Sequence, residues 1–245
     1  EYCYYVKSIG TYSIGGVADP LYNLSQQACG VPIDLIPPCP PVLTVKNLCD
    51  IPNSAPSEAP YDNNLSWTNP NEACDGSDDT ETYRIWYAPE AGMPLALLET
   101  QTGATNTTFT HSLELGLAGC YAVSAIDSVG NESALSDTVC VDNCPQYELP
   151  NVFTPNGDNA NDLYTPFKGW RFISRVDFQV FNRWGNLVFN TSDPALLWDG
   201  TDSDKKELAE GTYFFVCKVY ENRVSGTVLR PETLSGYIEL IRAGR

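Results

Sequence analysis

The sequence is poor in the side chains on which most catalytic and nucleic-acid-binding sites depend. Its 245 residues include one histidine, His111, one methionine, and 14 basic residues against 31 acidic ones. Phosphate binding needs clustered Lys and Arg, so this balance argues against a nucleic-acid-binding protein. The Gly-x-Ser-x-Gly elbow, the Walker loop and the His-Glu-x-x-His motif are absent, and no apolar run approaches the roughly 20 residues of a membrane helix. We therefore expect neither an enzyme nor a helical membrane protein.

What the chain does contain is turn residues and cysteine. Eighteen Gly, 18 Pro and a hydrophobic content of 42% favour an all-β fold of short strands around packed cores. Nine cysteines indicate an oxidising compartment, and therefore export from the cytoplasm. They do not suit a metal site, because the only short pair is Cys140 and Cys144 and the sole histidine lies far from it in the sequence.

Negative charge is concentrated in the first part of the chain. Residues 1–146 contain 18 acidic residues against Lys7, Lys46 and Arg84, whereas residues 147–245 contain 13 acidic residues against 11 basic ones. This change near residue 146 predicts a domain boundary. We interpret the acidic part as a solvated surface that keeps an extracellular protein soluble.

An internal repeat organises the first 146 residues. The segment Cys3-Tyr-Tyr-Val-Lys-Ser-Ile-Gly10 matches Cys120-Tyr-Ala-Val-Ser-Ala-Ile-Asp127, and each is followed by a Gly-containing turn and a second cysteine-bearing strand. Each copy predicts a β-hairpin. Cys3 and Cys29 lie symmetrically about residue 16, and Cys120 and Cys140 about residue 130. Both pairs are therefore expected to face each other across the strands and to form disulfides.

The strands around the second copy resemble a fibronectin type III domain covering residues 38–146. The supporting marks are Leu65-Ser-Trp67 on the second strand and the pair Leu117 and Tyr121, which is similar to a tyrosine corner. Residues 1–37 are then the C-terminal hairpin of an incomplete preceding copy. Because the sequence starts in strand-like residues with neither an initiating Met nor a signal peptide, we expect a C-terminal fragment of a longer protein.

The topology implied by this resemblance bears on the remaining cysteines. It favours the disulfides Cys39–Cys74 and Cys49–Cys144, while Cys49–Cys74 with Cys39–Cys144 is the competing scheme, and the sequence alone does not decide between them. Cys217 has no nearby partner and alternates as a buried strand residue, which predicts a free thiol in the core.

The last hundred residues carry the most specific motifs. These are Pro150-Asn-Val-Phe-Thr-Pro-Asn-Gly-Asp-Asn-Ala-Asn-Asp162, Phe181–Phe189, Trp198-Asp-Gly200, Glu210–Phe214 and Ser235–Arg242. In this order they resemble the gliding-motility-associated C-terminal domain, the type B sorting domain of the type IX secretion system of Bacteroidetes. The resemblance assigns residues 147–245 to this domain. The expected fold class is all-β: tandem immunoglobulin-like or fibronectin III-like β-sandwiches, the last being the sorting domain.

The resemblance implies export and anchoring as the function. Such domains direct their passengers through the type IX translocon and are associated with outer-membrane barrels of the PorP/SprF family, which hold the cargo at the surface. We therefore expect the secretion signal and surface anchor of a large gliding or attachment adhesin, exported to the cell surface and attached at the outer membrane. The last strand is expected to bind a partner by strand addition through Gly236, Tyr237, Ile238, Glu239, Leu240, Ile241 and Arg242.

Calcium is the one ligand that the last domain favours. Asn156, Asp158 and Asp162 offer hard oxygen atoms around a Gly-containing turn. The family usually has Gly where this sequence has Asn159, and no bidentate Glu completes the set. The alternative is that the side chains of Asp158 and Asn161 only cap the turn.

Other functions stay open beside the adhesin. Trp184, Trp198 and Tyr213 are aromatic residues of the kind that stack on sugars, although core packing is the favoured interpretation. Residues 38–146 are, in one alternative, a carbohydrate- or protein-binding module. In another, the chain is the non-catalytic end of a secreted hydrolase. The sequence that precedes Glu1 separates these, because further fibronectin-like copies favour an adhesin and a catalytic domain favours the hydrolase.

Overall fold

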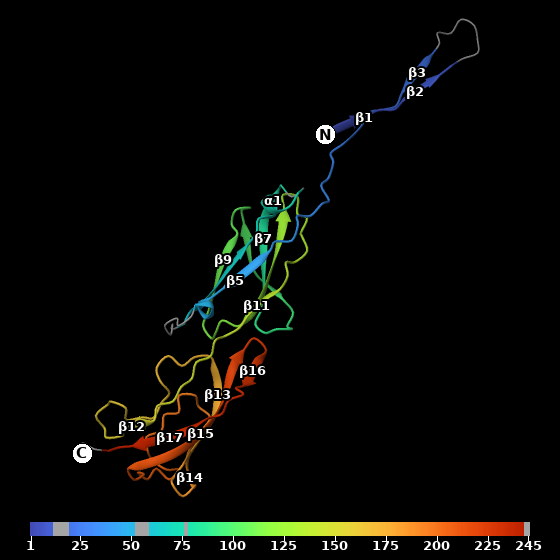
Figure 1. The fold of residues 1–245 in the computed structure, drawn as a ribbon. Helices are drawn as coiled ribbons and strands as arrows, with labels where there is room; N and C mark the ends of the chain where they lie inside the picture. Colours follow the sequence, from blue (N-terminus) through green and yellow to red (C-terminus); the bar gives the residue numbers. More distant parts are fainter. Residues whose placement is uncertain (12–19, 52–58, 76–77, 243–245) are drawn as a thin grey trace.

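The computed structural model describes residues 1–11, 20–51, 59–75 and 78–242, and nearly all of its regular structure is β-strand. Figure 1 shows the chain as a row of three parts, which are a long N-terminal hairpin, a sandwich in the middle and a last sheet. The predicted all-β class is confirmed. Turn-rich segments with alternating apolar residues fold as strands because this period places every second side chain on one face.

The first part consists of two short antiparallel ladders. Its strands are β1 (Tyr2–Tyr4), β2 (Lys7–Gly10), β3 (Leu21–Leu24) and β4 (Ala28–Gly30), with β1 paired to β4 and β2 to β3. Cys3 lies directly opposite Cys29 in the ladder, and the two form a disulfide. All strand residues in this part are exposed. The turn expected about residue 16 lies outside the described residues.

The middle part is a two-layer sandwich. Its elements are β5 (Leu43–Lys46), η1 (Leu48–Asp50), β6 (Tyr61–Trp67), α1 (Pro70–Ala73), β7 (Thr80–Ala88), β8 (Ala96–Thr102), β9 (Thr108–Leu113), β10 (Gly119–Asp127) and β11 (Val139–Val141). One sheet has the order β5-β6-β9 and the other β11-β10-β7-β8. The two layers enclose a core that contains Trp67, Tyr83, Ile85, Tyr121 and Val123. Strand β8 was not predicted, because it is an edge strand with no fully buried position and hence no core alternation to detect.

The predicted tyrosine corner lies in a buried hydrogen-bonded cluster. The Asn63 side-chain amide, which is fully buried, donates to the Leu117 carbonyl and to the Tyr121 hydroxyl, each at 2.8 Å. His111 Nδ1 lies 2.9 Å from the same hydroxyl, and burial lowers the pKa of this histidine. The only histidine of the chain is therefore engaged with a core tyrosine.

The last part is built on one six-stranded sheet. Its strands are β12 (Val152–Phe153), β13 (Ile173–Phe181), β14 (Leu187–Thr191), β15 (Gly211–Arg223), β16 (Gly226–Leu229) and β17 (Leu234–Leu240). They lie in the order β12-β17-β15-β13-β14, with β16 paired to the far end of β15. All pairs are antiparallel except β12 with β17. The short strands β12 and β16 were not predicted from the sequence.

Long connections cover one face of this sheet and close its core. Tyr164 and Trp198 come from two of them, form an isolated bridge with each other and are fully buried. They pack with Phe153, Phe178 and Phe215 into an aromatic cluster. The second layer of this part therefore consists mainly of loops and not of a second regular sheet.

Four disulfides join eight of the nine cysteines. They are Cys3–Cys29, Cys39–Cys74, Cys49–Cys144 and Cys120–Cys140, the pairs that the sequence favoured. Cys217 is a buried free cysteine, and burial is the main cause that raises its pKa to about 12. A thiol with this pKa stays protonated at neutral pH and is unreactive.

Candidate functional site on the last sheet

The outer face of the last sheet carries a row of apolar side chains across four strands. Phe214 of β15 lies opposite Tyr237 of β17 on one side and Phe181 of β13 on the other, and Phe181 pairs in turn with Leu187 of β14. Directly opposed residues project from the same face of a sheet. Phe214, Tyr237 and Leu187 are each about half exposed, at 50%, 47% and 50%. We call these four residues the outer row.

Strand β17, which was predicted to bind a partner, has one side largely open. Towards β15 it is paired along its whole length, from Leu234 to Leu240. Towards β12 it pairs only at Glu239 and Leu240. Among the described residues, positions 234–238 of β17 therefore have no backbone partner on that side, which leaves a short edge for strand addition.

Within the predicted partner-binding segment, the side chains divide between core and surface. Ile238 and Leu240 are fully buried, so they hold the domain together and do not offer contacts to a partner. Tyr237 is exposed at the open edge and Ile241 is 40% exposed. One face of the segment thus packs in the core of the domain, and the other face is accessible to a partner.

Arg242 fixes the end of this segment to two loops. Its guanidinium donates to the carbonyl oxygens of Pro155 and Gly200 at 2.9 and 3.0 Å. Gly200 has a positive φ of 75°, and a Cβ there would lie 3.1 Å from both the guanidinium and the Leu240 side chain. This explains the glycine of the Trp-Asp-Gly motif, because only glycine allows this turn and this approach.

The candidate calcium residues lie together in one exposed loop. Asn156 Nδ2 donates to Asp158 Oδ2 at 2.9 Å, and the Asp162 carboxylate accepts from the backbone N–H groups of Gly157 and Asn159 at 2.6 and 2.7 Å. The hydrogen bond from Asn156 is the main cause that lowers the pKa of Asp158. These carboxylates cap the turn, while calcium binding at Asn156, Asp158 and Asp162 stays a prediction.

The loop accommodates Asn159 at the position where the family usually has glycine. Asn159 adopts φ of 67° and Asn161 φ of 55°, values in the left-handed region that asparagine tolerates better than most residues. The turn can therefore keep a left-handed conformation at the position of that glycine. Asn161 contributes its backbone carbonyl to the loop, which accepts from Thr154 N at 2.9 Å.

Two of the three aromatic residues considered for sugar stacking are core residues, and one is not. Trp198 and Tyr213 are buried in the aromatic cluster, as predicted. Trp184 is 70% exposed in the turn between β13 and β14, with the Arg183 guanidinium 4.2 Å from its ring centroid. The core interpretation is wrong for Trp184, because the loop from residue 182 to 186 projects beyond the sheet.

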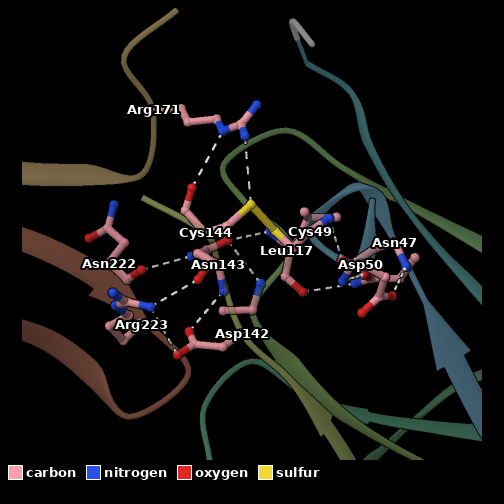
Figure 2. The surroundings of a disulfide bond; sticks show 12 residues. Asn47, Cys49, Asp50, Leu117, Asp142, Asn143, Cys144, Arg171, Asn222 and Arg223 are labelled. Carbon is pink, nitrogen blue, oxygen red and sulfur yellow. Dashed lines mark hydrogen bonds and ion pairs between the residues drawn. A yellow bond between two sulfur atoms is a disulfide. The ribbon is translucent and has the colours of Figure 1, made fainter. Parts of the chain in front are cut away.

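A disulfide and a polar network join the last sheet to the sandwich, as Figure 2 shows. Cys49 of η1 is bonded to Cys144, and Arg171 Nε donates to the carbonyl of Cys144 at 3.4 Å. The Asn143 side chain accepts from Leu117 N at 2.6 Å and donates to the carbonyl of Asn222 at 2.9 Å. The connection that contains Asn143 and Cys144 is therefore bonded to the sandwich on one side and to the last sheet on the other.

A buried ion-pair network supports this connection from the side of the last sheet. The Glu221 carboxylate accepts from Arg223 at 2.5 Å and from Arg230 at 2.6 Å, and its side chain is 7% exposed. Arg223 also forms an ion pair with Asp142 at 3.5 Å. Desolvation opposes ionisation of Glu221, but the two arginines outweigh it and lower its pKa. Sequence reasoning missed this network, since Asp142 lies about 80 residues before its other three members.

The outer row and the open edge of β17 lie in residues that match a known family. Residues 147–240 match the CHU_C type IX secretion signal domain. The resemblance expected from the motifs is confirmed, and this region is the sorting region of a type IX secretion cargo. A secreted protein that interacts with the secretion system is implied. No helix in the described ranges is long and apolar enough to span a membrane.

Two other comparisons add little. No curated protein matches the sequence. Among solved structures, the FN1–FN3 domains of chicken CNTN1 align with 84% of this chain and 67% of their own, at 13% sequence identity and a TM-score of 0.31.

Proposed function

We propose that the last domain is recognised through its outer row and the open edge of β17, and that it anchors a large adhesin at the cell surface. The exposed outer row is the observation that carries this proposal. A sorting signal that is read after folding must present its recognition groups on the surface. Contiguous exposed apolar side chains on a monomer commonly mark a site of interaction.

The two features complement each other energetically. An added strand at the edge of β17 gains main-chain hydrogen bonds, which supply affinity with little dependence on sequence. The outer row supplies specificity, because aromatic side chains are the residues that most often dominate binding energy. Tyr237 belongs to both features, since it lies on the open strand and in the row. A partner that covers both would bury this tyrosine at the centre of the contact.

The proposed division of the chain follows the same logic. Residues 1–37 would be the C-terminal hairpin of an incomplete fibronectin III-like domain of an adhesin, and residues 38–146 the next such domain. Residues 147–245 would be the sorting and anchoring domain. The passenger part carries 18 acidic residues against three basic ones, whereas the last part is nearly balanced. A receptor can therefore approach the last part without opposing a strongly negative field. The receptor would be an outer-membrane barrel of the PorP/SprF family, and no step in this function requires catalysis by these domains.

Export of a fusion protein tests the proposal. The 245-residue chain is fused behind a periplasm-directed fluorescent protein in a cell with type IX secretion, and surface fluorescence is measured. We expect display that needs residues 147–245 and the barrel. The double variant Phe214→Ser/Tyr237→Ser should reduce display at least tenfold and leave the fusion in the periplasm.

A matched control uses apolar residues of the same sheet outside the row. Val228 and Leu229 of β16 are 40% and 45% exposed, so Val228→Ser/Leu229→Ser removes a similar apolar surface. This variant should be displayed like the parent. Equal display of both variants would refute the outer row as the recognition surface. Display that persists without residues 147–245 would refute the sorting function itself.

A further inference from the structure

Three carboxylates from separate segments meet at the end of the sandwich that faces the N-terminal hairpin (Figure 1). Asp34 lies in the segment between β4 and β5, Asp79 immediately precedes β7, and Asp127 is the last residue of β10. One oxygen atom from each lies within 4.8 Å of the others. Asp34 is exposed, Asp79 is half-buried, and Asp127 is only 4% exposed.

The turn that follows β10 gathers these segments. Asn131 Nδ2 donates to Asp127 Oδ2 at 2.7 Å and to the Asp34 carbonyl at 3.2 Å. Ser128 donates from its hydroxyl to Asp79 Oδ2 at 3.0 Å and from its backbone N–H to the Asp79 carbonyl at 3.0 Å. Asp127 Oδ1 also accepts from the backbone N–H groups of Val129 and Asn131, and Asp34 Oδ1 accepts from that of Ile36. Each carboxylate still keeps lone pairs beyond those used in these bonds. The three can therefore share a further ligand.

No basic side chain in the described part of the chain forms an ion pair with any of the three. Residues 1–146 contain only three basic residues, and one of them, Arg84, pairs with Glu132. Within the described ranges, no ion pair therefore balances the negative charge that these three carboxylates gather.

A second, independent observation points to a ligand at the same place. The Thr80 hydroxyl is buried without a hydrogen-bond partner, in a residue that is 2% exposed. Thr80 follows Asp79 in the chain and pairs with Asp127 at the point where the register of β7 and β10 shifts. The buried hydroxyl therefore belongs to a residue that adjoins two of the three carboxylate-bearing residues. Buried hydroxyl groups in proteins are nearly always bonded, and a missing partner calls for an explanation.

We propose that the three carboxylates and the Thr80 hydroxyl bind a calcium ion. All of these donors are oxygen atoms, which calcium and magnesium prefer over nitrogen or sulfur. The ligands come from three separate segments of the chain. Calcium accepts six to eight oxygen ligands in flexible geometry, whereas magnesium demands a near-ideal octahedron, so ligands gathered from separate segments favour calcium. This site is distinct from the loop that contains Asn156, Asp158 and Asp162.

The ion would tie the segment that carries Asp34 to the sandwich. This segment joins the N-terminal hairpin to β5, and its residues from Val31 to Ile36 are exposed. Bound calcium therefore restrains the connection between one part of the molecule and the next. Without calcium, the same connection should be more accessible to protease.

Calorimetric titration of the chelator-treated 245-residue chain with calcium chloride tests the site. We expect a dissociation constant of about 0.1–1 mM, the range of extracellular calcium modules, and weaker binding of magnesium. Asp34→Asn and Asp79→Asn should each weaken calcium binding at least tenfold. Asp78→Asn, at an exposed neighbouring position, is the matched control and should bind like the parent. Calcium should also slow cleavage between residues 31 and 37 in the parent and in Asp78→Asn, but not in the other two variants.

Thr80→Val separates a ligand role from a structural one. Removing an unsatisfied hydroxyl should leave the melting temperature without calcium unchanged or raised. The same variant should weaken calcium binding several-fold. No heat at 10 mM calcium, or equal affinity in Asp34→Asn, Asp79→Asn and the parent, would overturn the proposal. Binding lost only in Asp158→Asn would instead assign the ion to the loop of the last domain.

Discussion

The disulfide between Cys49 and Cys144 should stabilise the sandwich more than the disulfide between Cys120 and Cys140. The first closes a loop with a sequence separation of 95 residues, and the second one of 20. A disulfide restricts the unfolded chain more when the loop is longer. The loop-closure expression gives about 4.7 kcal/mol for the long loop and about 3.3 kcal/mol for the short one at 25 °C.

The comparison requires two double variants, Cys49→Ser/Cys144→Ser and Cys120→Ser/Cys140→Ser, so that no unpaired partner remains. The difference of about 1.4 kcal/mol corresponds to roughly 6–11 °C in melting temperature for a domain of about 100 residues. Differential scanning calorimetry measures both transitions of the chain. The transition of residues 147–245 should move less than that of the sandwich, because its core contains neither disulfide.

Loss of the long-loop disulfide should also free the connection around Asn143. Limited proteolysis should then cut Cys49→Ser/Cys144→Ser between residues 141 and 147 faster than it cuts Cys120→Ser/Cys140→Ser. A smaller effect of Cys49→Ser/Cys144→Ser than of Cys120→Ser/Cys140→Ser on the sandwich transition would refute the argument from loop length. It would mean that strain or residual structure in the unfolded state outweighs loop closure.

Two further outcomes follow from the ion-pair network and from backbone packing. Glu221 has a lowered pKa in the folded state, so its contribution to stability is present above its ordinary pKa of 4.5 and is lost as pH falls through the folded value. Denaturant melts of the last domain between pH 3 and 7 should show this loss. The variant Glu221→Gln should be less stable than the parent at pH 7, and its stability should depend less on pH. A Cβ at Gly119 would lie 2.4 Å from the Tyr87 ring. Gly119→Ala should therefore destabilise the sandwich by about 1–3 kcal/mol, while the control Gly10→Ala, with no atom within 4 Å, should stay within about 0.5 kcal/mol of the parent.

Local periodicity was sufficient to predict most strands and the cross-strand cysteines. In β10 the alternating residues Tyr121, Val123 and Ala125 belong to the core of the sandwich, although the strand is buried along most of its length. The hairpin symmetry about residue 130 places Cys120 opposite Cys140. Both features depend on residues close in sequence. A pattern of period 2 and a turn position are therefore enough to obtain them.

Edge strands and loop layers escaped prediction for a physical reason. Strand β8 has exposed or half-buried residues throughout, and β12 has only two residues, so neither carries a clear apolar period. The covering layer of the last sheet consists of connections in which Tyr164 and Trp198 meet across more than 30 residues. Trp184 was misplaced because composition alone does not tell a turn that projects into solvent from one that folds over the core.

The groups that form sites were the least predictable. Glu221 contacts two arginines on its own hairpin, but its link to Asp142 runs through Arg223 across about 80 residues. The carboxylates of Asp34 and Asp79 meet only because the turn after β10 draws their segments together. No local sequence pattern predicts such contacts between residues that are far apart in the chain, because they form only in the completed fold.

The composition of β15 supports the proposal that a partner covers the outer face of the last sheet. Residues Tyr213, Phe214, Phe215 and Val216 form an uninterrupted apolar run, although the strand is buried on one face only. Tyr213 and Phe215 fill the core, and that task places no demand on Phe214 and Val216, which are 50% and 38% exposed. An antiparallel sheet with one solvated face usually alternates apolar with polar residues. A strand that is apolar on both faces resembles the central strands of sheets that are covered on both sides. The side chains of β15 that do not fill the core therefore form an apolar outer face. Tyr237 of β17 extends this face, next to the unpaired edge of β17.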